Sequence, residues 1–149
     1  MVRKGTVRFH FIEIFALIGQ KRLKETVADL LFREGRAFES MDYIFCSDEE
    51  LLQINQEFLK HDDLTDIITF DLSDDPAVLK GEIYISVERV KDNAMIFNIP
   101  FHTELARVIF HGALHLCGYN DKGQKDQQLM RRKEEEYLAE WEGRRPRST

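Results

Sequence analysis

The segment HGALHLCGYND, residues 111–121, constrains the fold more than any other part of the chain. It closes a stretch from about Phe101 to Cys117 in which apolar residues cover nearly every side of a helix, and a helix of that kind is buried. Pro100 and Gly118 stand where proline and glycine commonly begin and end a helix. The chain is therefore expected to fold around this helix, whose few polar side chains need partners.

Two of those polar side chains are histidines at helical spacing. Because successive helical residues turn by about 100°, His111 and His115 point the same way from adjacent turns. Gly118 then lets the chain turn back and place Asp121 beside them. Three protein ligands that leave room for water are typical of a catalytic metal site. A histidine pair at this spacing is more often an ordinary polar feature, but the buried helix, the glycine break and the following acid favour a metal-dependent hydrolase.

The rest of the pattern predicts one α+β domain over residues 1–149, with a flexible tail at 143–149. Alternation and apolar runs predict strands at 7–11, 41–47, 67–72 and 81–86. Helical spacing and capping residues predict helices at 21–36, 48–58, 88–97, 101–117 and 126–140. This order indicates a small mixed four-stranded sheet packed with about five helices, with the metal site on a buried helix.

Composition excludes several classes of protein. A net charge of −6 argues against a generally basic surface for nucleic acid, although it leaves room for a local groove. No apolar run approaches the roughly 20 residues of a membrane span, and the N-terminus lacks the apolar core of an export signal. Cys46 and Cys117 are too few for a disulfide framework and suit free thiols in a reducing cytoplasm.

At these residues the chain resembles the YbeY family of bacterial endoribonucleases and rRNA maturation factors. The likeness covers SDEELLQINQEFL, LTDIITFDL, GEIYIS and HGALHLCGYND. It implies a cytoplasmic, metal-dependent enzyme that cuts single-stranded RNA in rRNA maturation and ribosome quality control. It also implies one Zn²⁺ per chain and RNA, as rRNA or the small ribosomal subunit, as partner.

The chain departs from the family pattern at the site. The family's third ligand is usually histidine, and Asp121 stands in its place. A carboxylate is an acceptable zinc ligand, but its negative charge makes the metal a weaker Lewis acid, so the identity of the metal stays open. Leu59 occupies the place of a usual arginine, and Lys60 beside it is the candidate for the missing positive charge. Glu82 stands where the family commonly has aspartate.

A metal at the site would activate water and polarise a phosphodiester oxygen, and Lys60 would help stabilise the developing charge. Metal hydroxide could attack without a separate base. If a base is needed, Asp66 and Glu82 are the candidates, at the start of two adjacent predicted strands. The alternative interpretation makes both of them ordinary carboxylates at a turn or strand end, with Thr65 and Asp66 capping local backbone.

Other charged groups receive weaker interpretations. His61, in the sequence HDD, is expected in a solvated loop, and His10 and His102 are assigned no role. A basic cluster near the C-terminus could contact RNA phosphates, but a charged helix face is favoured because three glutamates follow at 134–136. That cluster comprises Arg131, Arg132, Lys133, Arg144, Arg145 and Arg147.

Three functions remain open from the sequence. The first is a metal-dependent endoribonuclease acting on rRNA, and the second is a ribosome-assembly binding factor with a structural metal and little or no catalysis. The third is a metallohydrolase of another bond, such as a peptide. Gly112 argues against the third, because helical zinc peptidases carry their glutamate base at that place. The glycine is also expected to leave space over the metal for a bulky substrate.

Overall fold

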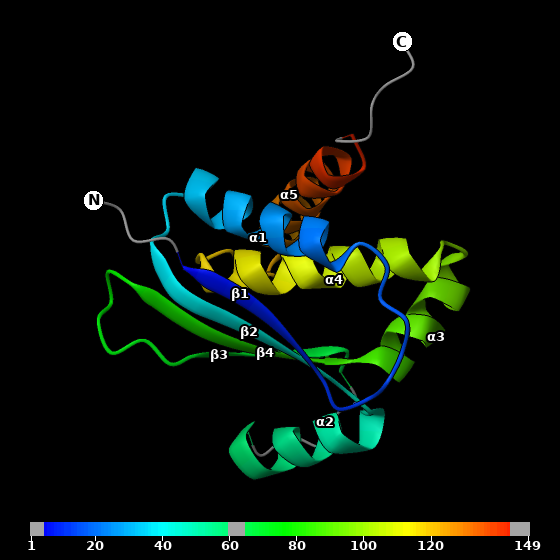
Figure 1. Cartoon of the computed structure of the whole chain (residues 1–149). Helices are drawn as coiled ribbons and strands as arrows, with labels where there is room; N and C mark the ends of the chain where they lie inside the picture. Colours follow the sequence, from blue (N-terminus) through cyan, green and yellow to red (C-terminus); the bar gives the residue numbers. More distant parts are fainter. Residues whose placement is uncertain (1–4, 60–64, 144–149) are drawn as a thin grey trace.

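The computed structural model describes residues 5–59 and 65–143. In chain order the elements are β1 (Thr6–Phe11), α1 (Gln20–Arg33), β2 (Phe38–Cys46), α2 (Asp48–Ile54), a π-helical turn (Asn55–Leu59), β3 (Ile67–Asp71), β4 (Leu79–Ser86), α3 (Val87–Phe97), α4 (Phe101–Leu116) and α5 (Gln124–Gly143). Figure 1 shows how they are arranged. The predicted order of strands and helices is confirmed, with bounds that differ by a few residues.

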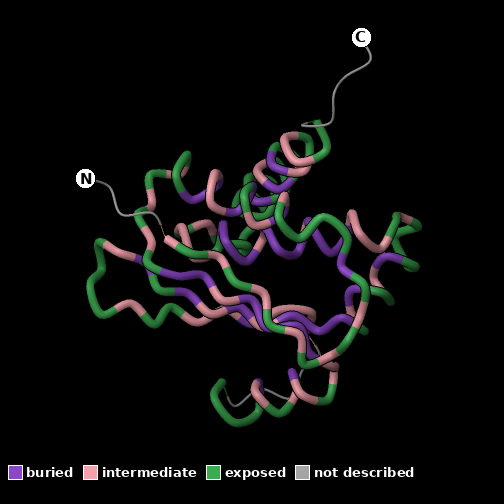
Figure 2. The backbone as a smooth tube through the Cα atoms, viewed as in Figure 1, coloured by how far each residue is buried: buried purple, intermediate pink, exposed green. Residues whose placement is uncertain are grey.

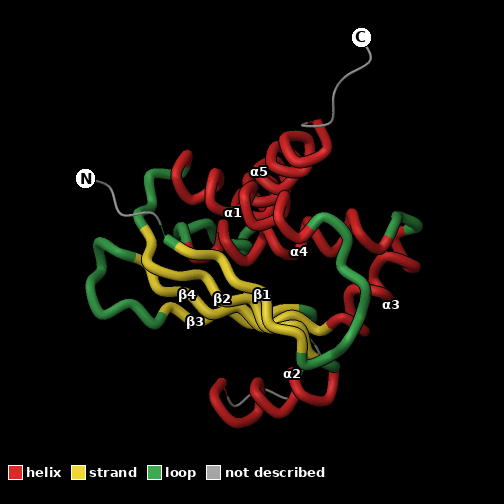
Figure 3. The backbone as a smooth tube through the Cα atoms, in the orientation of Figure 1, coloured by secondary structure: helices red, strands yellow, loops and turns green. Residues whose placement is uncertain are grey.

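The strands form one mixed sheet in the order β1-β2-β4-β3 (Figure 3). β2 pairs in parallel with both β1 and β4, whereas β3 pairs antiparallel with β4. The parallel pairs follow from helical crossovers, which parallel strands need, and the antiparallel pair is joined by the turn that contains Pro76. Over the residues that the structure describes, the α+β fold with a four-stranded mixed sheet and five α-helices is therefore as predicted.

The two faces of the sheet are covered differently. Helices α1, α4 and α5 lie over one face, and α2 lies below the other (Figure 1). Buried residues concentrate in the strands and in the helices that face them (Figure 2). Along β4 the core side is Leu79, Ile83 and Ile85, each 0% exposed, while the alternate positions Lys80, Glu82 and Tyr84 are more exposed. The period of two thus separates a packed face from a largely open one.

Helix α4 is the core helix, as its apolar sequence predicted. Gly112 packs against the sheet, where an added Cβ would lie 2.9 Å from Ile67 Cδ1 and 3.0 Å from Ile83 Cδ1. Its small size therefore lets α4 approach β3 and β4. The expectation that Gly112 leaves space over a metal was wrong, because this position faces the strands.

The ends of the elements account for the remaining differences from the prediction. Ser47 and Glu50 form a capping box that starts α2, whose regular hydrogen bonding gives way to the π-helical turn after Ile54. Gly143 ends α5 instead of opening a tail, and residues 144–149 lie outside the described part, as do Lys60 and His61.

Cys46 and Cys117 are free thiols, and Cys46 is the buried one. Among the described residues, no helix has the length and apolarity to cross a membrane.

Candidate active site

The site is built along one side of α4. Glu104, Arg107, His111 and His115 follow at spacings of three, four and four residues, which places them on one stripe of the helix. From Leu105 onward, the other residues of α4 are apolar or glycine and largely buried against the sheet, α1 and α5. The stripe begins with a carboxylate that is 0% exposed and ends with the exposed His115. Its residues therefore run from the core to an open surface.

His111 is fixed by a carboxylate from α5. Its Nδ1 donates to Glu134 Oε2 at 2.5 Å, and the Glu134 side chain is 4% exposed. Arg107 Nη1 donates to the other oxygen of Glu134 at 3.0 Å, and Arg107 Nε donates to Glu104 at 2.9 Å. Two buried carboxylates, one guanidinium and one imidazole thus form a continuous network, which satisfies charges that would be costly alone.

The network shifts the pKa values of its members. Burial alone lowers the pKa of the His111 imidazole, but the hydrogen bond to Glu134 and the nearby carboxylate charges outweigh burial and raise it. Burial raises the pKa of the Glu134 carboxyl, but its contacts with His111 and Arg107 outweigh this and lower it. Glu134 is therefore ionised at neutral pH and accepts from Nδ1–H of His111. The neutral imidazole must then carry its lone pair on Nε2.

His115 is oriented by the helix end. The N–H of Gly118 donates to His115 O at 3.0 Å and that of Tyr119 to Leu114 O at 3.1 Å, the pattern of a Schellman cap. Gly118 has a φ of 107°, which glycine adopts readily. This cap carries Tyr119 O to within 3.2 Å of His115 Nδ1, and a carbonyl can only accept. His115, like His111, therefore leaves Nε2 free to act as a ligand.

Asp121 comes back to the helix as its spacing predicted. Its Oδ2 lies 3.8 Å from His111 Nε2, and its side chain is 52% exposed. Gln127 Nε2 donates to the Asp121 backbone carbonyl at 3.0 Å and ties the loop to α5. The carboxylate thus faces the free nitrogen of His111 across an open space.

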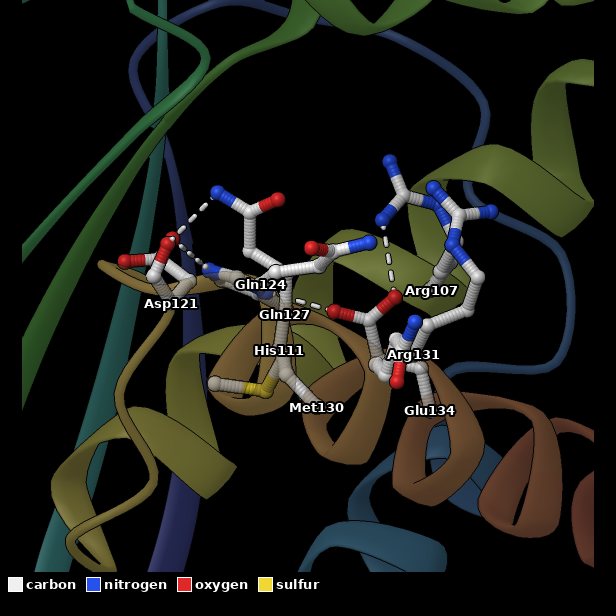
Figure 4. A pocket seen from close by; sticks show the side chains of 9 residues that line it. Arg107, His111, Asp121, Gln124, Gln127, Met130, Arg131 and Glu134 are labelled. Atoms are coloured by element: carbon white, nitrogen blue, oxygen red, sulfur yellow. Dashed lines mark hydrogen bonds and ion pairs between the residues drawn. The ribbon is translucent and has the colours of Figure 1, made fainter.

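Two pockets meet at this point. One, of about 350 Å³, lies between α4 and the start of α5 (Figure 4). The other, of about 290 Å³, lies between α4 and the start of β3. Arg107, His111 and Asp121 line both. The middle of the polar stripe, at Arg107 and His111, therefore lies between two adjoining pockets.

Asp66 lines the β3-side pocket, together with Thr65 and Thr69. Burial raises the pKa of the Asp66 carboxyl, against the opposing charges of His111 and Arg107. Thr65 Oγ1 donates to Ile67 O at 3.2 Å, so Thr65 supports local backbone as one interpretation expected. Of the two predicted candidates for a base, Asp66 is the one that lines a pocket with the two histidines.

Glu82 lies away from them. Because β3 and β4 are antiparallel, the start of β4 pairs with the end of β3, and Glu82 is opposite Phe70. Its neighbour Gly81 faces Leu116 of α4, so the pleat turns Glu82 to the opposite face. There Tyr84 Oη donates to it at 2.5 Å. The prediction that Glu82 shares a site with Asp66 was therefore wrong. Lys60, the predicted cation, lies outside the described residues.

The donor chemistry fits a metal although the described side chains are not gathered tightly. Within residues 5–59 and 65–143, no group of three histidine, cysteine or acidic side chains is close enough to hold an ion as it stands. Both histidines nevertheless hold Nδ1 on an oxygen acceptor and present Nε2, which is how metal-ligating histidines are commonly oriented. Residues of these types and orientations fit Zn²⁺ with a carboxylate as third ligand.

Sequence reasoning missed Arg107 and Glu134. Arg107 could have been found, because it lies four residues before His111 on the same stripe of an otherwise apolar helix. Glu134 carried no such signal, since it is 23 residues from His111 and sits in a run of charges. Arg131, from the basic cluster, lines the α5-side pocket, whereas Lys133 pairs with Glu34.

Within this α+β fold, two oriented histidines and an arginine of the core helix, with a carboxylate from the loop that follows it, line two adjoining pockets. A sequence profile described as Endoribonuclease YbeY matches residues 13–142. The chain belongs to the YbeY family.

Known relatives agree with this assignment. The Endoribonuclease YbeY of Flavobacterium psychrophilum is 50% identical over 75% of this chain and 79% of its own length. That of Christiangramia forsetii is 44% identical over 93% of this chain and 96% of its own. The solution structure of TM1509 from Thermotoga maritima is similar with a TM-score of 0.63 and 34% identity, covering 92% of this chain and 89% of that one.

Proposed function

We propose that this protein is a metal-dependent endoribonuclease that cuts single-stranded RNA in rRNA maturation and ribosome quality control. The observation that carries the proposal is the pair of oriented histidines on α4, with Asp121 3.8 Å from His111, at the junction of two pockets. Its relatives' name, Endoribonuclease YbeY, supports RNA as the substrate.

The residues proposed to hold the metal are His111, His115 and Asp121. A bound Zn²⁺ would lower the pKa of water and polarise a phosphoryl oxygen. Glu134 holds the proton on Nδ1 of His111, so that Nε2 is the nitrogen presented to the metal. Tyr119 O does the same for His115.

The remaining groups act on the RNA and on protons. Arg107 lines both pockets, but Glu104 and Glu134 accept from its three nitrogens, so its proposed role is to hold Glu134 in place beside His111. Lys60 stays the predicted cation beside the phosphate. Asp66 is proposed to accept the proton of the attacking water, because a raised carboxyl pKa brings it nearer the working pH. The water oxygen then bonds to phosphorus as the bond to the leaving ribose oxygen breaks, and that oxygen takes up a proton from solvent.

The test is cleavage of a defined single-stranded rRNA fragment by the wild type, by His111→Ala and after chelation. Cleavage should fall by at least about 100-fold in both altered samples, since the loss of a ligand should exceed the effect of losing a ligand's supporting partner. RNA binding without cleavage in any added divalent metal would instead support a ribosome-assembly binding factor.

The role of Asp121 needs its own measurement. The metal content of purified protein should fall in Asp121→Ala relative to the wild type. Asp126→Ala is the matched control, because Asp126 lies nearby in the first turn of α5 and is exposed. Unchanged stoichiometric metal in Asp121→Ala would remove this carboxylate from the site.

A further inference from the structure

The pocket between α4 and α5 is lined by several residues that have no role in the proposed metal site. Three glutamine side chains from the first turns of α5, Gln124, Gln127 and Gln128, form part of its wall. Figure 4 shows Gln124 and Gln127 beside His111 and Asp121. Met130, 2% exposed, contributes an apolar surface, and Arg131 completes the α5 side. Its volume of about 350 Å³ falls in the range of small-ligand sites, roughly 300–1,000 Å³.

We propose that this pocket binds one base of the RNA strand, on one side of the phosphate that is cut. The inference rests on the proposed function and adds to it a subsite with a stated ligand, a nucleobase. A glutamine side-chain amide carries both a hydrogen-bond donor and an acceptor. It can therefore pair with the edge of a base, where donors and acceptors stand side by side.

The charges in the pocket favour a base over a second phosphate. Glu134 is bound by both His111 and Arg107, and Arg107 is also bound by Glu104. Arg107 is therefore largely neutralised on this side. Arg131 is the cation at the rim, and an arginine plane can stack on a base or contact the adjoining phosphate.

The position of the pocket agrees with the path of a strand. His111 and Asp121 line both hollows, so a phosphate beside His111 has a pocket on either side. Gln127 already donates to Asp121 O at 3.0 Å, which links the amide wall to the loop that carries the third proposed ligand. Gln124 and Gln128 are exposed and supply the groups that would meet the base.

The test is base preference, measured with a set of short RNAs that vary one position at a time around the cleaved bond. The wild type should favour one base at one adjacent position by about fivefold or more, the discrimination that a well-placed pair of hydrogen bonds supplies. The double variant Gln124→Leu, Gln128→Leu should lose that preference, with the change in KM larger than the change in kcat. Gln53→Leu, an exposed position on α2 across the sheet, should keep it.

A second measurement separates this proposal from the proposed function. Adenosine, cytidine, guanosine and uridine monophosphates are titrated into ¹⁵N-labelled wild type, and the side-chain amide signals of Gln124 and Gln128 are followed. Shifts in these signals, absent for ribose 5-phosphate, support the subsite even if no RNA is cleaved. The subsite is overturned if no nucleotide shifts these amide signals. It is also overturned if the wild type cleaves RNA without a base preference, or if the double variant keeps the preference of the wild type.

Discussion

Two triads, each made of one carboxylate, one arginine and one histidine, lie on opposite faces of the sheet. On the helix-covered side, Glu134 accepts from His111 at 2.5 Å and from Arg107 at 3.0 Å. On the open side, Asp42 of β2 accepts from Arg8 at 2.7 Å and contacts His10 at 2.8 Å. The residue types therefore do not distinguish the candidate site from an ordinary surface cluster.

The two triads differ in how far their side chains are buried and in which imidazole nitrogen contacts the carboxylate. The carboxylate is 4% exposed in the first triad and 19% in the second, and the histidine is 20% against 48%. Glu134 occupies Nδ1 of His111 and leaves Nε2 toward Asp121, whereas Asp42 occupies Nε2 of His10. The comparison teaches that the two pairs differ in which histidine nitrogen the carboxylate leaves free, and only that of His111 faces a pocket.

The largest expected difference is in stability. Arg107→Met leaves Glu104 and Glu134 buried without their shared cation, and it should lower the free energy of unfolding by about 3–5 kcal/mol. Arg8→Met is the matched control and should change little, because an exposed ion pair contributes little. Urea denaturation at neutral pH measures both. Equal effects of the two variants would remove the distinction between the triads.

The next difference concerns the ligand role of His111. Glu134→Gln keeps the size of the side chain but removes the charge that fixes His111, and metal affinity should fall by about 10- to 100-fold. Asp42→Asn makes the same change in the open triad and should leave affinity unaltered. Calorimetric titration with Zn²⁺ measures this. An affinity that survives Glu134→Gln would show that the buried carboxylate has only a structural role.

A change in how α4 packs on the sheet should affect the triad of His111 and leave the triad of His10 unchanged. Gly112→Ala brings a methyl group against Ile67 and Ile83 and should destabilise the fold by about 1–3 kcal/mol. NMR signals of the His111 ring should move while those of His10 stay. Gly123→Ala, with open space around the position, is the control. Movement of both rings in Gly112→Ala would mean that the two faces are coupled.

The smallest effect is the pH dependence of the metal-free protein. The pKa of His111 is raised, so its pairing with Glu134 stabilises the fold fully below the ordinary histidine pKa. That contribution is lost as pH rises through the raised value. Glu134→Gln should therefore destabilise more at pH 6 than at pH 9, and NMR titration should show a lower His111 pKa. A destabilisation that grows toward pH 9 would contradict this assignment of charges.

The sequence predicted the elements well because each carries a local signal. The apolar helix around His111, its glycine end and the capping box at Ser47 all act within a few residues. Two histidines four apart on one helix are fixed by helical geometry, and the return of Asp121 follows from the turn at Gly118.

The errors came from relations that depend on the assembled sheet. Asp66 and Glu82 both begin predicted strands, but β3 and β4 are antiparallel, so their starts lie at opposite ends of the pair. The side that Gly112 faces depends on how α4 sits on the strands. Glu134 reaches His111 only because α5 packs across α4, which no local pattern encodes.

The most direct test of this account is the metal content of the purified wild type, His111→Ala and His10→Ala. The account predicts one metal ion per chain in the wild type and in His10→Ala, and a clear loss in His111→Ala. Stoichiometric metal in His111→Ala, or equal loss in both variants, would contradict the claim that the pocket-facing histidine of α4 is a metal ligand.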